Sequence, residues 1–175
     1  MKINILGRGE GWEHGLNAEG EVWSINYWSP QTTRLFNIHP FDHEYYTKNI
    51  REIENARAAG CMVVTQENFD MPLAMKVLGT DFFSSSVDWL IALAILEGQA
   101  KEIHLWGCCM SDPNHYEKRV GANYWVGYAN ALEIKVVVHG NSTICTNPDG
   151  LTYGTFTPMQ RKFHPPVCET TQSTQ

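Results

Sequence analysis

The sequence predicts a single α/β domain, built on a Rossmann-like and mostly parallel sheet with helices on both faces. Short apolar runs alternate along the chain with longer segments of helical periodicity, which is the order expected of crossover units in such a sheet. Most of the apolar runs are followed by glycine or small polar residues, as is typical of strand ends that form a ligand site. The length of 175 residues fits one domain.

The expected strands are short and rich in isoleucine, valine and leucine, which is typical of strands that are buried on both faces. They cover residues 2–6, 21–27, 35–39, 61–65, 102–106 and 135–138. Pro40 follows the third strand and ends it, because proline has no backbone N–H to donate to a ladder.

The expected helices cover residues 43–59, 87–97 and 115–132. Gly60 and Gly98 follow the first two of these helices and supply their stops. We expect residues 1–145 to form a Rossmann-like nucleotide-binding domain. Residues 146–175 are expected to form a C-terminal extension that is partly disordered, because this segment is rich in threonine, proline and glutamine.

Composition and charge exclude several classes of protein. The 13 lysine and arginine residues are scattered and the net charge is −6, so we expect no extended nucleic-acid surface. No apolar run reaches the roughly 18 residues of a membrane span, and the N-terminal segment lacks the features of a signal peptide. The five cysteines show no zinc-type spacing and are expected to be reduced. These features predict a soluble, cytoplasmic protein, and the aromatic content of 11% permits a homo-oligomer.

A glycine-rich turn follows the first expected strand and contains Gly7, Arg8, Gly9 and Gly11. Glycines let a backbone approach a phosphate closely and expose N–H groups to it. The spacing differs from the GxGxxG pattern of dinucleotide-binding folds. A nucleotide-binding turn and a simple tight turn therefore both fit this segment.

Polar or glycine residues also follow the other expected strands and would meet at the same edge of the sheet. They are Asn26, Asn37, His39, Gly107, Asn141 and Ser142. Asparagine amides can bind a nucleobase or ribose, or they can simply tie down a loop. His39 and His43 flank Asp42, but this spacing matches no standard metal site, so we expect no bound metal.

Two further segments carry candidate functional groups. Ser84, Ser85 and Ser86 precede an apolar helix and can donate hydroxyls and amides to a phosphate, although ordinary helix capping requires only one of them. His115 and Tyr116 open the next helix. A histidine can act as a general acid or base and a tyrosine hydroxyl can stabilise a departing phosphate, while an exposed histidine without a role fits the position equally well.

Several short segments, taken in order, resemble the Campylobacter-type bacterial sialyltransferases and the related motility accessory factors, in particular small phage proteins of that group. The segments that carry the resemblance lie within residues 1–145 and are residues 7–11, 25–27, 84–94, 101–107 and 141–142. The resemblance implies a Rossmann-like domain that binds a cytidine monophosphate sugar. It places Gly9 near the phosphate, Asn26 near the nucleoside, and Asn141 and Ser142 beside the base.

The sequence also departs from this family. Gly107 is followed by two cysteines where the family has Gly-Ile-Asp, and His39 stands where the family usually has an asparagine. The family's lid insertion, which contains its catalytic histidine, is replaced by residues 111–120, in which His115 is the substitute that we expect.

The function predicted on this basis is that of a nucleotide-sugar-dependent glycosyltransferase-like protein, with no cofactor other than a nucleotide-type ligand, of cytidine type if the resemblance holds. His115 would deprotonate the acceptor hydroxyl and Tyr116 would stabilise the departing phosphate. Two alternatives stay open. One is a non-catalytic protein that binds or sequesters a nucleotide, encoded by a phage and acting in the host cytoplasm; the other is a hydrolase of nucleotides or nucleosides.

Overall fold

The fold is described from a computed structural model, which describes residues 1–112, 115–146 and 168–169. Six parallel strands form the body of the sheet. They are β1 (Lys2–Leu6), β2 (Glu21–Ile25), β3 (Arg34–Asn37), β4 (Met62–Thr65), β5 (Glu102–Trp106) and β6 (Lys135–His139). The two-residue strand β7 (Cys168–Glu169) pairs in parallel with the outer edge of β6. The predicted single α/β domain with a parallel sheet is thus confirmed.

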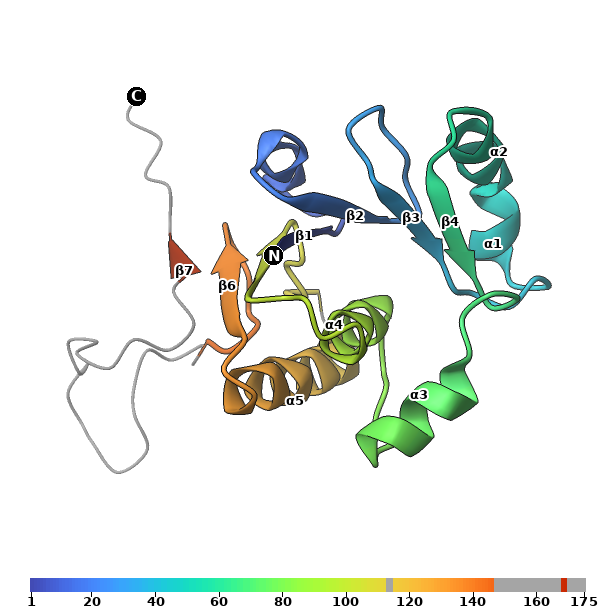
Figure 1. Cartoon of the computed structure of the whole chain (residues 1–175). Helices are drawn as coiled ribbons and strands as arrows, with labels where there is room; N and C mark the ends of the chain where they lie inside the picture. Colours follow the sequence, from blue (N-terminus) through green and yellow to red (C-terminus); the bar gives the residue numbers. More distant parts are fainter. Residues whose placement is uncertain (113–114, 147–167, 170–175) are drawn as a thin grey trace, which may run out of the picture.

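The spatial order of the strands is β4-β3-β2-β1-β5-β6-β7 (Figure 1). The chain moves outward from β1 to β4 and then crosses back to β5, which lies on the other side of β1. The order therefore reverses between β1 and β5. In open parallel sheets of this kind, which many nucleotide- and cofactor-binding enzymes share, ligands bind outside the carboxyl ends of the strands near such a reversal.

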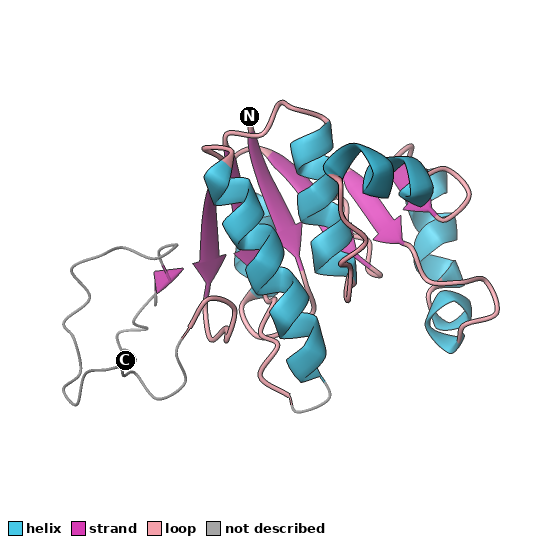
Figure 2. Ribbon diagram, turned by 90° about the horizontal axis from the view of Figure 1, so that it is seen from below, coloured by secondary structure: helices cyan, strands magenta, loops and turns pink. Residues whose placement is uncertain are grey.

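Helices cover both faces of the sheet, as predicted. They are η1 (Trp12–Asn17, a 3₁₀-helix), α1 (Glu44–Lys48), α2 (Ile50–Ala58), α3 (Met71–Leu78), α4 (Ser86–Leu96) and α5 (Tyr116–Ala131). Helices α4 and α5 lie side by side on one face, with α3 packed against α4 (Figure 2). On the other face, η1 contacts β1 and β5, and α2 contacts β3 and β4.

The face of the sheet under α4 and α5 is apolar. Alternate strand residues point to it and join the helices in one core cluster. Its fully buried strand residues include Ile3, Ile5, Trp23, Phe36, Ile103 and Leu105. Helix α4 is apolar on nearly all sides, because it is enclosed by the sheet and by α3 and α5.

The opposite face carries a polar cluster on β5 and β6. Nε2 of His104 lies 3.1 Å from Oε2 of Glu102, and Nδ1 of His104 lies 2.8 Å from Nε2 of His139. The imidazole of His139 stacks on the indole of Trp106, with ring centroids 3.5 Å apart and planes inclined by 2°. Nε1 of Trp106 donates in turn to Oδ1 of Asn4, at 3.1 Å. On this face, hydrogen bonds and ring stacking therefore add to apolar packing in stabilising the sheet.

Two helical features differ from the prediction. The expected helix over residues 43–59 is divided at Asn49, which ends α1 and begins α2. The Asn49 side chain donates to the backbone carbonyl of Tyr45, and such local bonds compete with helix continuation. Helix α3 was not predicted at all. Asp70 caps it by accepting from the N–H of Leu73 at 2.9 Å, and Gly79 ends it in a left-handed conformation.

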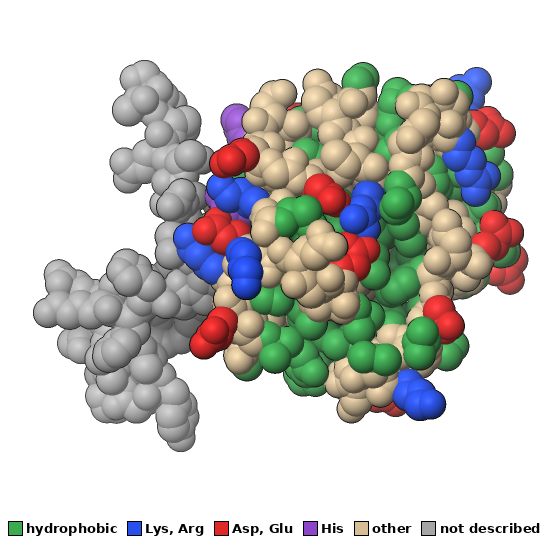
Figure 3. All heavy atoms as spheres, viewed as in Figure 1, with side chains coloured by type: hydrophobic (Ala, Val, Ile, Leu, Met, Phe, Trp, Pro, Cys, Tyr) green, Lys and Arg blue, Asp and Glu red, His purple; other side chains and the backbone are tan. Residues whose placement is uncertain are grey.

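Exposed apolar side chains gather on α3, α5 and the segments beside them, on the lower part of the view in Figure 3. They are Leu73, Val77, Phe82, Val120, Tyr124 and Leu132. No helix in the described residues is long and apolar enough to cross a membrane. The homo-oligomer and the cytoplasmic location stay predictions. The predicted extension over residues 146–175 lies outside the described residues, apart from Thr146 and β7.

Candidate functional site

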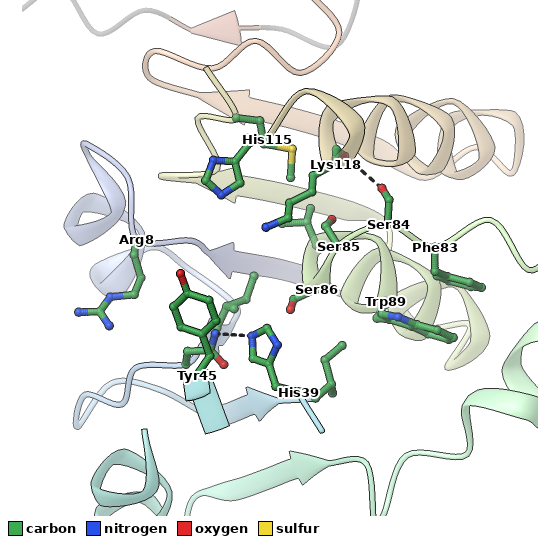
Figure 4. Close-up of a pocket in the computed structure, with 15 residues that line it drawn as sticks. Arg8, His39, Tyr45, Phe83, Ser84, Ser85, Ser86, Trp89, His115 and Lys118 are labelled. Atoms are coloured by element: carbon green, nitrogen blue, oxygen red, sulfur yellow. Dashed lines mark hydrogen bonds between the residues drawn. The ribbon is translucent and has the colours of Figure 1, made fainter. Parts of the chain in front are cut away.

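A pocket opens at the carboxyl edge of the sheet, bounded by the ends of β2 and β3 and by the N-terminal ends of α4 and α5 (Figure 4). Its volume is about 510 Å³, which suits a small molecule. The structure brings together several of the residues predicted to form a site. Those that line the pocket are Arg8, Asn26, His39, Ser84, Ser85, Ser86 and His115.

The N-terminal end of α4 is held by the buried carboxylate of Asp88. Its Oδ2 accepts from the N–H of Ser84 at 2.7 Å and from the N–H of Ser85 at 3.0 Å, and the hydroxyls of both serines also donate to the carboxylate. Ser85 is the N-cap and accepts from the N–H of Asp88, which completes a capping box. Ser84 and Ser85 therefore shape the helix end, and the N–H groups of Ser86 and Val87, at the first two helical positions, have no partner among the described residues.

The same helix end fixes the start of α5. An added Cβ at Gly121 would collide with the hydroxyl of Ser84 and the carboxylate of Asp88, so glycine is required for the two helices to approach. The hydroxyl of Ser84 also lies 3.3 Å from the carbonyl oxygen of Glu117 and 3.4 Å from that of Lys118. This contact brings the first turn of α5 beside α4 and places the Lys118 side chain, together with His115, in the pocket.

Asn26 and His39 form the opposite wall. Asn26 has a left-handed backbone, with φ of 59°, and its N–H donates to the carbonyl of Phe36 at 2.9 Å. Its Nδ2 lies 3.2 Å from Nε2 of His39, while its buried Oδ1 has no partner among the described residues. Buried amide oxygens are rarely left unpaired, and Asn37, which does not line the pocket, has the same feature.

The predicted glycine turn has a packing role in this fold. The N–H of Gly7 donates to the carbonyl of Trp106 and the N–H of Gly9 to that of Gly107, both at 2.8 Å. A Cβ on Gly7 would lie 2.5 Å from the carbonyl oxygen of Gly107, so the two loops are in backbone contact. The N–H groups of Gly7 and Gly9 thus already have protein partners. Gly11 caps η1 in a left-handed conformation.

Three of the remaining predicted residues, Asn37, Asn141 and Ser142, do not line the pocket. Asn37 is fully buried, and neither its Nδ2 nor its Oδ1 has a partner among the described residues. Ser142 is buried and donates to the carbonyl of Cys108 at 2.7 Å, while exposed Asn141 lies near Glu10. Tyr116 begins α5, but its side chain lies outside the part of the molecule that the structure describes.

Among the residues that the structure describes, the charged side chains that line the pocket are both cationic, Arg8 and Lys118. Neither forms an ion pair with another described residue. Burial lowers the pKa of His39, and the neighbouring His43 and Lys118 lower it further. Within the described residues, no group of three or more histidine, cysteine or acidic side chains is placed to hold a metal ion.

Besides the apolar lining residues and Trp89, sequence reasoning missed a cationic and a phenolic side chain of the pocket, Lys118 and Tyr45. Lys118 lies three residues after His115 near the start of α5, so the two share one helical face, and this spacing was a usable signal. Tyr45 follows His39 and His43, and no site residue was predicted in the helix that begins there. Aromatic side chains complete the wall, where Phe83 stacks on Trp89 with ring centroids 3.6 Å apart.

Comparison with known proteins identifies no family. No family model matches the sequence, and no curated protein matches it. Among solved structures, thiamine pyrophosphokinase from Bacillus subtilis is similar, with a TM-score of 0.44 and 18% sequence identity over 79% of this chain. The match spans 60% of that enzyme's chain. A likeness at this level carries no conclusion about activity.

These findings correct the sialyltransferase resemblance suggested by the sequence. The structure that matches is a thiamine pyrophosphokinase, whose fold family differs from that of the sialyltransferases. The prediction that the chain belongs to the sialyltransferase and motility-accessory-factor group is therefore wrong. The motifs that suggested it have local causes in this fold, namely the backbone contact of Gly7 with Gly107 and the capping box at Ser85.

Proposed function

We propose that this protein binds a small phosphorylated ligand of the nucleotide type in the pocket at the carboxyl edge of its sheet. One observation carries the proposal. In a chain of net charge −6, the two charged side chains that line this pocket among the described residues, Arg8 and Lys118, are both cationic. A concave site lined by one sign of charge attracts ions of the opposite sign.

The other donors of the pocket fit the same ligand class. The free N–H groups of Ser86 and Val87 lie at the positive end of the helix dipole of α4, where phosphate groups bind favourably. Asn26 lines the pocket, and an amide side chain pairs with hydroxyl or amino groups such as those of a nucleoside. A nucleotide combines an anionic group with such donors, and a volume of about 510 Å³ accommodates a mononucleotide.

Calorimetric titration with nucleoside monophosphates, nucleotide sugars and inorganic phosphate tests the proposal. We expect Arg8→Gln and Lys118→Gln each to weaken binding by about tenfold or more, because each removes a charge-assisted hydrogen bond. The matched control is Arg51→Gln, which removes an exposed cation from α2 outside the pocket and should leave the affinity unchanged. The pocket would be rejected as an anion site if Arg8→Gln and Lys118→Gln bound with wild-type affinity, as the control should. It would also be rejected if the wild type bound none of the ligands.

Transfer of a group from the bound nucleotide, such as the glycosyl unit of a nucleotide sugar, is a second candidate function. The position of His115 in the same pocket favours it, because an imidazole there can accept a proton from an acceptor hydroxyl. The two candidates differ in one measurable respect. A binding protein returns the nucleotide unchanged after prolonged incubation, whereas a transferase consumes it when an acceptor is present and a hydrolase consumes it without one.

A further inference from the structure

Tyr45 contributes a hydroxyl to the pocket that the proposed function does not yet use. The residue lies in α1, and its side chain lines the pocket. Figure 4 shows its hydroxyl directed into the space that Lys118 and His115 face, while Arg8 lines the edge of the same pocket with its guanidinium over the ring of Tyr27. We infer that Tyr45 contacts the ligand and that its hydroxyl donates a hydrogen bond to the ligand's anionic group. This inference rests on the proposed anion-binding function and adds a neutral donor to it.

The start of α1 determines where the Tyr45 side chain lies. His43 is the N-cap of α1, and its Nδ1 accepts from the N–H of Tyr45 at 3.2 Å. The rings of His43 and Tyr45 are stacked, with centroids 5.4 Å apart and planes inclined by 16°. The backbone hydrogen bond and the ring contact with His43 together hold Tyr45 in place.

His39 connects this pair of rings to the sheet. Its ring centroid lies 5.1 Å from that of His43 and 5.5 Å from that of Tyr45. The amide of Asn26 can only donate through Nδ2, so Nε2 of His39 accepts and the ring carries its proton on Nδ1. A continuous set of contacts therefore runs from the end of β2 through His39 to Tyr45, and it orients the phenol without using its hydroxyl.

A phenol suits the place that it occupies. The Tyr45 hydroxyl has no hydrogen-bond partner among the described residues, although the ring itself has neighbours. A phosphoryl group presents more acceptor positions than Arg8 and Lys118 can fill, and a neutral hydroxyl fills one without repelling these two cations. The tyrosine is 49% exposed, so it does not stabilise the core and its substitution does not threaten the fold.

The test compares Tyr45→Phe with Tyr46→Phe in calorimetric titrations with inorganic phosphate and with cytidine monophosphate. Tyr45→Phe keeps the ring stack and removes the hydroxyl, and we expect about tenfold weaker binding of both probes. Tyr46 is the adjacent tyrosine, but it packs against Phe41 and the smaller core cluster under α2, so Tyr46→Phe should bind as the wild type does.

A second measurement reports on the hydroxyl itself. Hydrogen bonding of a phenol to an anion shifts its near-ultraviolet absorption, so the difference spectrum on ligand addition should contain a tyrosine component that Tyr45→Phe lacks. Wild-type affinity in Tyr45→Phe, or an unchanged difference spectrum, overturns the inference. If Arg8→Gln still weakens binding in that case, the proposed function stands without Tyr45. If the wild type binds neither probe, the proposed function fails as well.

Discussion

Two places at the carboxyl edge of this sheet meet the usual description of a ligand site, and they have opposite structures. The crevice between β1 and β5, where the strand order reverses, is closed by backbone contact between Gly7, Gly9 and Gly107. The neighbouring region, between the ends of β2 and β3 and the start of α4, is open and forms the pocket. Glycines line the closed crevice, whereas polar and cationic side chains line the open pocket.

The difference shows that a glycine-rich strand end has two physical uses. Glycine lets a backbone approach a ligand closely, and it equally lets two loops of the same chain approach each other. The N–H groups decide between these uses, and in this protein those of Gly7 and Gly9 donate to Trp106 and Gly107. The predictions below test whether the two regions are as separate as the structure indicates.

The largest effect is expected from Gly107→Ala in the closed crevice. Gly107 has φ of 61°, and an added Cβ would lie 2.6 Å from Cβ of Trp12 and 2.7 Å from the carbonyl oxygen of Gly9. Backbone strain and overpacking together should lower the free energy of unfolding by roughly 3 kcal/mol or more, measured by urea denaturation.

The control for this change is Gly127→Ala in α5. No atom lies within 4 Å of an added Cβ at Gly127, and the helix interior favours alanine by about 0.5–1 kcal/mol. Wild-type stability in Gly107→Ala would show that the two loops are not in the contact described.

A smaller loss of stability is expected from Asp88→Asn, behind the serines that line the open pocket. The amide cannot accept all the bonds that Ser84 and Ser85 donate to the carboxylate, and its NH₂ group would face donors. We expect a loss of roughly 2 kcal/mol in the free energy of unfolding, together with weaker anion binding because the start of α4 is displaced. Differential scanning calorimetry, with and without cytidine monophosphate, measures both.

Asp70→Asn serves as the matched variant, because Asp70 caps α3 from an exposed position and asparagine caps helices as well as aspartate does. If Asp88→Asn lost stability but bound the anion with undiminished affinity, the start of α4 would not belong to the anion site.

The smallest expected effect is on the pH dependence of stability, and it distinguishes His139 from His39. Burial, with a further contribution from His104, lowers the pKa of His139 to about 4, below its ordinary value of 6.5. The unfolded chain therefore takes up this proton first, so stability should fall as the pH decreases from 6.5 to 4. Because His139 is partly exposed, we expect roughly 1 kcal/mol, which His139→Asn should abolish.

His39 should respond to ligand where His139 does not. Burial and the nearby His43 and Lys118 lower the pKa of His39, and a bound anion would oppose that shift. In NMR titrations of the imidazole protons, cytidine monophosphate should raise the pKa of His39 and leave that of His139 unchanged. A ligand-induced shift at His139 would place the anion at the other face of the sheet.

The fold was largely predictable because its strands obey a simple pattern. The buried isoleucines of β1 and the alternating polar and apolar residues of β5 identify both strands, and both ends of each were predicted as observed. The break at Asn49 was not predicted, because it depends on one side chain that bonds to the carbonyl of Tyr45. Helix α3 was missed although Asp70 and Gly79, its two caps, are visible in the sequence.

The site was less predictable, because its composition depends on which residues the loops bring together. His39 and His115 come from segments far apart in the chain, and only the folded structure shows that they line one pocket. Residue type did not separate Asn26, which lines the pocket, from Asn37, which does not. The spacing of Lys118 from His115 indicates a shared helical face, but its place in the pocket depends on the contact of Gly121 with the start of α4, which only the structure shows.

The hydrogen bonds of the polar cluster on the second face of the sheet determine which nitrogens of His104 and His139 carry hydrogen. The carboxylate of Glu102 accepts only, so His104 carries hydrogen on Nε2 and presents a bare Nδ1. His139 must then carry hydrogen on Nε2 and keeps a bare Nδ1. The two imidazoles thus share the same tautomer, and one proton entering at Nδ1 of His139 can be relayed to Glu102 by successive transfers without any ring turning.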